Sequence, residues 1–173
     1  MTLTPAIHHY DRWVSTPNGR LFTRTWEPDR IRSEVPILLF HDSLGCVDLW
    51  RNFPEALCAA TRQRVIAYDR LGFGRSDKPV DDAVYTFDFH RNYLKAFIER
   101  LDLRNITLVC QDWGGLLGLT LPHEYRDRFR RMIVMNTTLA VGKAPTQGFI
   151  DWRNYVASRP DLDVAGLMKR SSP

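Results

Sequence analysis

The sequence predicts an α/β protein whose sheet is mostly parallel and covered by helices on both faces. Four short apolar runs have the length and composition of buried strands: residues 35–40, 64–69, 106–112 and 132–136. Three other segments carry apolar residues at helical spacing: 49–60, 87–101 and 113–121. Strands that alternate with helices pair in parallel, and the connecting helices then pack on both faces of the sheet.

The chain opens with a predicted β-hairpin. Residues 9–15 and 20–26 alternate polar and apolar side chains on either side of Pro17-Asn18-Gly19. Asn-Gly favours the tight turn that joins two antiparallel strands. The first run after the hairpin, Val35 to Phe40, is apolar at nearly every position, as in a strand that is buried on both faces.

The segment from Asp69 to Asp77 contains two alternating glycines, Gly72 and Gly74. It lacks the third glycine of a dinucleotide-binding loop and the Gly-Lys-Ser/Thr of a phosphate-binding loop. We therefore predict a structural loop. The helix predicted next presents one apolar face, formed by Phe89, Tyr93, Leu94, Phe97, Ile98 and Leu101.

The strand at 106–112 ends abruptly at a carboxylate, within Cys110-Gln-Asp-Trp-Gly-Gly115. Small residues two positions before and after Asp112 match a nucleophile elbow, a tight strand-to-helix turn that exposes its central side chain. We predict a helix over 113–121, which Pro122 ends or kinks.

Asp112 is the predicted catalytic nucleophile. An aspartate is ionised at neutral pH and needs no base, whereas serine does. Attack on a saturated carbon by a carboxylate gives an ester that water can cleave, while a serine would give a stable ether. The elbow therefore suits haloalkanes or epoxides better than carboxylic esters. In the alternative interpretation, Asp112 only caps the following helix.

Two backbone amides are predicted to form the oxyanion hole, those of Trp113 and Ser43. Trp113 follows the nucleophile, and its indole N–H could also hold a departing halide. Ser43 lies in the loop after the strand that ends at Phe40. A core position for the Trp113 ring and an ordinary strand-to-helix turn at Ser43 are the alternatives.

The histidine that would activate water is not evident in the sequence. In the α/β-hydrolase order this base follows the nucleophile. Among His8, His9, His41, His90 and His123, only His123 follows Asp112. It is eleven residues away along the predicted helix, too far to serve Asp112.

Composition argues against several other classes. The net charge is +4, from 24 basic and 20 acidic residues, without a basic stripe, so we expect no nucleic-acid partner. We expect no metal or organic cofactor, since no Cys/His spacing suits zinc. No segment resembles a signal peptide or a membrane span. Three cysteines without framework spacing predict reduced thiols and a cytoplasmic location.

The strand-helix alternation stops near residue 139. Four helix and strand breakers follow: Gly142, Pro145, Gly148 and Pro160. We predict a core domain over 1–138 and the start of a helical cap domain over 139–173.

The motifs resemble haloalkane dehalogenases of the α/β-hydrolase superfamily. The resemblance rests on residues 72–79, 85–92 and 118–122, and above all on Gln111 directly before Asp112-Trp-Gly-Gly115. Residues 148–152 and 167–170 resemble the cap of a subfamily in which two tryptophans bind the halide. The resemblance implies Asp112 as nucleophile, with Trp113 and Trp152 as halide donors.

The sequence also departs from that family. His41-Asp-Ser-Leu44 stands where dehalogenases usually have His-Gly-Glu/Asn-Pro, and residues 1–77 look more like general α/β hydrolases. The family fold has eight core strands, of which six are predicted here, and its catalytic acid and histidine would follow residue 173.

The expected function is cleavage of a carbon–halogen bond through an aspartyl alkyl ester, with a haloalkane and water as the small-molecule partners and an alcohol and halide as products. We expect that this chain alone does not turn over. An epoxide or ester hydrolase of the same fold and a non-catalytic hydrolase fragment are the alternatives.

Overall fold

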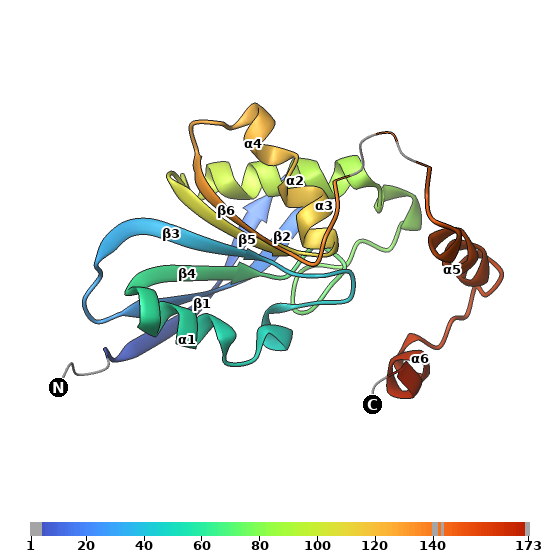
Figure 1. The fold of residues 1–173 in the computed structure, drawn as a ribbon, viewed down its shortest axis with the longest axis horizontal. Coiled ribbons are helices and arrows are strands. Elements are labelled where there is room, and N and C mark those ends of the chain that lie inside the picture. Colours follow the sequence, from blue (N-terminus) through green and yellow to red (C-terminus); the bar gives the residue numbers. More distant parts are fainter. Residues whose placement is uncertain (1–4, 140–141, 143, 172–173) are drawn as a thin grey trace. The chain divides into compact units, whose positions relative to one another are not determined.

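The computed structural model describes residues 5–139, 142 and 144–171 (Figure 1). Contacts divide the chain into two compact units, Met1–Leu139 and Ala140–Pro173. The first unit holds a six-stranded sheet with the order β1-β2-β4-β3-β5-β6. The described residues of the second form two helices, α5 (Gln147–Ala157) and α6 (Val164–Ser171).

The predicted hairpin is confirmed. Strands β1 (Ile7–Thr16) and β2 (Gly19–Pro28) are antiparallel, and Thr16 pairs with Gly19 across the Pro17-Asn18 turn. Gly19 has φ of 141°, a conformation that costs glycine little. The hairpin joins the rest of the sheet through antiparallel pairing of β2 with β4.

The parallel part of the sheet also agrees with the sequence. It consists of β3 (Ser33–Phe40), β4 (Gln63–Tyr68), β5 (Ile106–Gln111) and β6 (Phe129–Met135). Strand β3 pairs in parallel with β4 and β5, and β5 pairs in parallel with β6.

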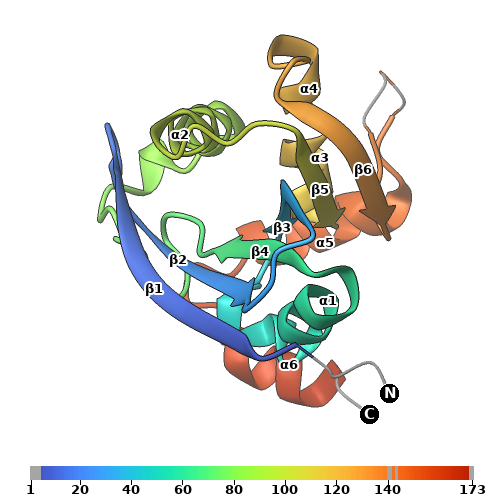
Figure 2. The ribbon, with the colours of Figure 1, turned by 90° about the vertical axis from the view of Figure 1, so that its left-hand side faces the viewer.

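Helices cover both faces of the sheet (Figure 2). On one face lie α2 (Phe87–Arg100), α3 (Trp113–Gly118) and α4 (Leu121–Glu124). On the other lie the 3-10 helix η1 (Val47–Trp50) and α1 (Phe53–Thr61). A short 3-10 helix, η2 (Asp82–Val84), precedes α2.

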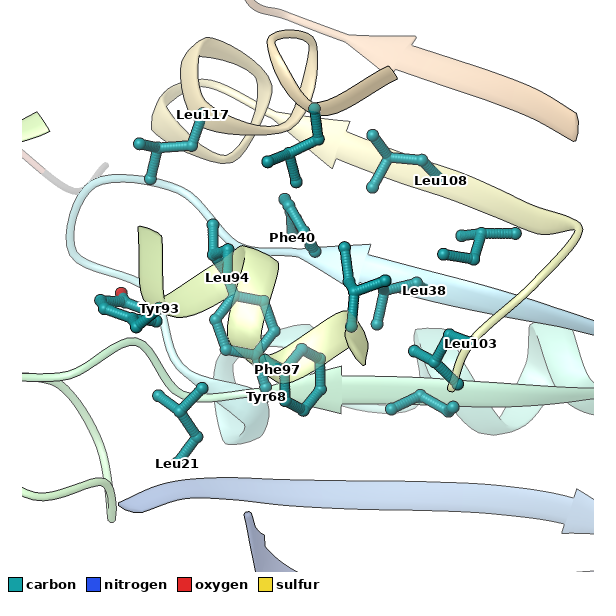
Figure 3. Close-up of a cluster of buried hydrophobic side chains, with 14 of the residues drawn as sticks. Leu21, Leu38, Phe40, Tyr68, Tyr93, Leu94, Phe97, Leu103, Leu108 and Leu117 are labelled. Carbon is teal, nitrogen blue, oxygen red and sulfur yellow. The ribbon is translucent and has the colours of Figure 1, made fainter. Parts of the chain in front are cut away.

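Alternate residues of the central strands divide between two apolar clusters. Leu38, Phe40 and Leu108 face α2, where they pack with Tyr93 and Phe97 (Figure 3). The intervening residues Ile37, Leu39 and Val109 instead pack with Val47, Trp50 and Cys58. Complete burial of each large apolar side chain contributes about 2 kcal/mol, so these clusters hold the helices against the sheet.

Two predicted helices are each interrupted. A single helix over 49–60 was wrong, because Arg51 has φ of 53° and ends η1, and Pro54 lies in the first turn of α1. A continuous helix over 113–121 was also wrong, since α3 ends at Gly118 and α4 begins at Leu121. Pro122 lies in the first turn of α4, where its missing N–H has no cost.

The loop from Asp69 to Asp77 is held by hydrogen bonds within the core unit. The Asp69 carboxylate accepts from the amides of Val47 at 2.6 Å and Arg75 at 2.7 Å. The Ser76 hydroxyl donates to the Asp69 carbonyl and accepts from the Phe22 amide. These contacts agree with the interpretation of this segment as a structural loop.

Candidate active site

Asp112 lies on a strained turn between β5 and α3. Its φ and ψ are 46° and −123°, a combination that L residues rarely adopt. Hydrogen bonds to its backbone hold this geometry: its N–H donates to the Asn136 carbonyl at 3.2 Å, and its carbonyl accepts from the Thr137 hydroxyl at 2.7 Å. The Asp112 side chain makes no capping bond to α3, which argues against a simple helix cap.

Glycine is required on the helix side of this turn. A Cβ on Gly114 would collide with the carbonyl oxygens of Phe40 and His41. A Cβ on Gly115 would collide with the Thr137 side chain. The Gly-Gly pair therefore lets α3 begin directly against the end of β3 and brings the oxyanion loop close to Asp112.

The Ser43 amide contacts the predicted nucleophile. Its N–H donates to Oδ2 of Asp112 at 3.0 Å. This bond joins two residues that are far apart in the sequence. The loop that contains Ser43 therefore holds Oδ2 of the carboxylate and leaves Oδ1 free of that contact. No corresponding bond from the Trp113 amide to this carboxylate is found among the described residues.

The Trp113 side chain is partly exposed and does not lie in the core. It lines a cavity of about 200 Å³ together with Ser43, Arg70, Phe73, Tyr85, Thr86, Phe87 and His90. A second hollow, of about 250 Å³, is lined by Asp112, Leu116, Asn136, Thr137 and Thr138. The elbow therefore borders two hollows, one at the carboxylate and one at the indole.

Trp152, the other predicted halide donor, lies on α5 in the second unit. Its ring is exposed and stacks on Tyr155 with centroids 5.9 Å apart. Its role in halide binding stays a prediction.

Two histidines have environments that the sequence did not reveal. His41 is buried, and burial lowers its pKa to about 3, with a further contribution from the nearby Arg70 cation. His90 lines the cavity beside Trp113, and its Nδ1 lies 2.8 Å from the Tyr93 hydroxyl. Burial lowers the pKa of His90 to about 4. His123 is exposed on α4.

Within residues 5–139, 142 and 144–171, no three His, Cys, Asp or Glu side chains are grouped as a metal ion would require. The same described residues form no helix that is long and apolar enough to cross a bilayer.

A parallel sheet with helices on both faces, a carboxylate on a strained strand-to-helix turn and an opposing loop amide define a hydrolase-type core with an acidic nucleophile position. The family model for the alpha/beta hydrolase fold matches residues 35–167. The chain belongs to the alpha/beta hydrolase fold family.

The chain is similar to several haloalkane dehalogenases. It is 43% identical over 139 residues to a haloalkane dehalogenase of Psychrobacter cryohalolentis, covering 80% of this chain and 46% of that protein. It is 38% identical over 135 residues to haloalkane dehalogenase 1 of Mycobacterium tuberculosis, covering 77% and 44%. The chain thus spans about half the length of the curated relatives it matches.

The chain is also similar to solved structures of proteins with this fold. The tetrameric haloalkane dehalogenase DpaA of Paraglaciecola agarilytica has a TM-score of 0.79 and 38% identity, over 92% of this chain and 54% of that one. An epoxide hydrolase of Vigna radiata has a TM-score of 0.69 over 85% and 46% of the two chains, but only 18% identity, which supports the fold alone.

Proposed function

We propose that this chain carries the nucleophilic half of a haloalkane dehalogenase. One observation supports this most directly: Asp112, on its strained turn, has one carboxylate oxygen bonded to the Ser43 amide and the other unheld by that loop. The likeness to haloalkane dehalogenases over 80% of the chain agrees with it.

The chemistry follows from the two carboxylate oxygens. Oδ1 of Asp112 attacks the carbon that bears the halogen, a carbon–oxygen bond forms, and the carbon–halogen bond breaks with its electron pair on the leaving halide. The Trp113 and Trp152 indole N–H groups stabilise that anion. Oδ2 becomes the ester carbonyl oxygen, and it already accepts a hydrogen bond from Ser43.

Hydrolysis completes the reaction in our proposal. Water attacks the ester carbonyl carbon of Asp112, and the Ser43 and Trp113 amides stabilise the negative charge that develops on Oδ2. A base takes one proton from the water, the alcohol leaves, and the Asp112 carboxylate is restored. The haloalkane and water thus become an alcohol, a halide and a proton, without a metal or organic cofactor.

The five histidines of this chain are poor candidates for that base. His8 and His9 lie on β1, four strands from β5 in the sheet order, and His123 is exposed on α4. Both ring nitrogens of His41 are hydrogen-bonded, and burial makes His90 a weak base. We therefore propose that the alkyl ester accumulates when the chain acts alone. We further propose that residues 139–173 begin a cap, and that the three free cysteines fit a reducing, cytoplasmic setting.

The test is to incubate the folded chain with 1,2-dibromoethane or 1-bromobutane and to follow bromide and intact mass together. We expect bromide release to stop after stoichiometric alkylation, and peptide mapping to place the alkyl group on Asp112. Asp112→Asn, which keeps the size of the side chain, should acquire no alkyl group.

Two outcomes would contradict the proposal. Sustained bromide release that Asp112→Asn abolishes would show that the chain has its own base. An unmodified wild-type protein that instead reacts with epoxides or p-nitrophenyl esters in a parallel panel would move the function to another hydrolase class.

A further inference from the structure

The peptide group between Asp42 and Ser43 is held from both sides. Its N–H donates to Oδ2 of Asp112 at 3.0 Å. Its carbonyl oxygen accepts from Nη2 of Arg70 at 2.6 Å and from Nδ1 of His41 at 2.9 Å. In a planar trans peptide the C=O and N–H point in opposite directions, so the groups that hold this carbonyl also aim the N–H at the nucleophile.

Arg70 occupies an unusual environment for a cation. It is only 3% exposed, and none of the ion pairs among the described residues includes it. Its Nη2 donates to two consecutive carbonyls, those of Asp42 and Ser43, the second at 2.8 Å. The guanidinium also packs over the Phe73 ring, 4.6 Å from its centroid. A buried cation without a carboxylate is costly, and here its charge is directed at the oxyanion loop.

His41 completes a closed set of contacts with Arg70. The Arg70 backbone N–H donates to Nε2 of His41 at 3.0 Å, so that nitrogen must be unprotonated. Nδ1 therefore carries the proton that is donated to the Asp42 carbonyl. Because His41 follows β3 and Arg70 follows β4, the set fixes the loop to the ends of two neighbouring strands.

We propose that Arg70 is a positioning residue that fixes and polarises the Ser43 amide, with the neutral His41 as its support. Hydrogen bonds to a peptide carbonyl strengthen the N–H of the same peptide as a donor, by about 10–30% per bond. The stronger donor holds Oδ2 during alkylation and stabilises the charge on that oxygen when the ester is hydrolysed. The proposal rests on the function proposed above, in which Asp112 is the nucleophile.

The first measurement needs no substrate. We would label the full chain with ¹⁵N and measure the Ser43 amide proton shift and hydrogen-exchange rate in wild type, Arg70→Met and Arg70→Lys. Arg70→Met removes the charge and both bonds to the carbonyls. We expect its Ser43 amide to move upfield and to exchange about fivefold faster, the factor that corresponds to a hydrogen bond worth about 1 kcal/mol. Arg70→Lys keeps the charge as a single point donor, and we expect an intermediate rate.

The matched control is Arg75→Met. Arg75 belongs to the same loop and also packs over an aromatic ring, that of Phe22 at 4.6 Å, but it pairs with Asp48, and none of the hydrogen bonds or ion pairs described in the structure joins it to residue 42 or 43. We expect wild-type Ser43 signals in this variant. A Ser43 amide in Arg70→Met that matches wild type would overturn the proposal, and if Arg70→Met does not fold, an unchanged amide in Arg70→Lys would do so.

The second measurement is the rate of alkylation by 1,2-dibromoethane. We expect Arg70→Met to slow the maximal rate about tenfold while the half-saturating substrate concentration stays constant, since Arg70 acts on Asp112 through the loop. An effect on the half-saturating concentration alone would argue against positioning. If the wild type is not alkylated, the proposed function fails, whereas the amide measurement still decides the role of Arg70.

Discussion

Burial of the neutral His41 ring makes the stability of the core depend on pH. The unfolded chain binds a proton on this histidine with a pKa of about 6.5, whereas in the folded protein burial lowers the pKa to about 3. Between these two pH values the unfolded state binds more protons than the folded state. The contribution of the neutral His41 ring to the free energy of unfolding is therefore fully present above pH 6.5 and decreases as the pH falls. His90, whose folded pKa is about 4, acts in the same direction.

We therefore predict that the free energy of unfolding falls on the order of 1 kcal/mol per pH unit between pH 6.5 and 5, where most carboxylates remain ionised. Urea titrations at several pH values would measure it. His41→Asn should have a lower stability but a flatter dependence on pH. His123→Gln, at an exposed site, should keep the wild-type slope, and equal slopes in wild type and His41→Asn would contradict this account.

At this scale the sequence predicted the Asp112 elbow but not its supports. Asp112 was evident because a strand, a carboxylate and two glycines are contiguous. The roles of Arg70 and His41 arise from contacts between residues 29 positions apart, and only the pairing of β3 with β4 brings them together. The sequence predicted an oxyanion role for the Ser43 amide from the position of its loop in this fold, which stays a prediction, and it did not predict that this amide bonds to Asp112.

The junction of β3, β5 and α3 depends on close backbone approach at Gly114. The carbonyls of Phe40 and His41 occupy the space that a side chain would need. We predict that Gly114→Ala destabilises the core by about 1–3 kcal/mol or prevents folding, because backbone cannot move aside as a flexible side chain can. Denaturant unfolding followed by tryptophan fluorescence would measure the loss.

Gly148→Ala is the matched control. Gly148 lies within α5, and no heavy atom lies within 4 Å of the Cβ it would gain. Alanine is the better helix former, so we expect no loss of stability. A Gly114→Ala protein as stable as Gly148→Ala would show that the elbow can accommodate a methyl group, against the geometry described above.

Element types followed from the sequence more readily than element boundaries. The strands β3 and β5 are buried on both faces, so their continuous apolar composition was enough to predict them as strands. The break at Arg51 depends on a left-handed residue, a conformation that arginine rarely adopts and that no sequence pattern indicates. The break between α3 and α4 has a different cause. It lies just before Pro122, so the sequence indicated an interruption but not that it would fall at Leu119 and Thr120, which keep right-handed helical angles.

The sheet of this chain ends in an apolar edge. Strand β6 pairs only with β5 in the described sheet, and Met132, Ile133 and Val134 are 49%, 48% and 50% exposed. Both faces of the strand are therefore open as well as its hydrogen-bonding edge. Such an edge can template pairing with another chain.

We predict that the wild-type chain associates in a concentration-dependent way and that Ile133→Lys reduces this association, because a charge on an edge strand opposes further pairing. Gel filtration with light scattering over a range of concentrations would measure it. Val80→Lys adds the same charge at a fully exposed loop site and should have little effect. A wild type that stays monomeric throughout would be evidence against an adhesive edge.

The order of strands in the sheet has a consequence for synthesis of the chain. Strand β3 is central, and its neighbours are β4, which follows soon after it, and β5, which begins only at Ile106. As the polypeptide leaves the ribosome, the hairpin, β3 and β4 can assemble while one side of β3 still awaits its partner. Bringing β5 next to β3 closes a long loop, and the chain loses conformational entropy before the contacts between the two strands can form. The core unit should therefore remain an unfinished nascent intermediate, open to chaperones, until β5 and the elbow have emerged together.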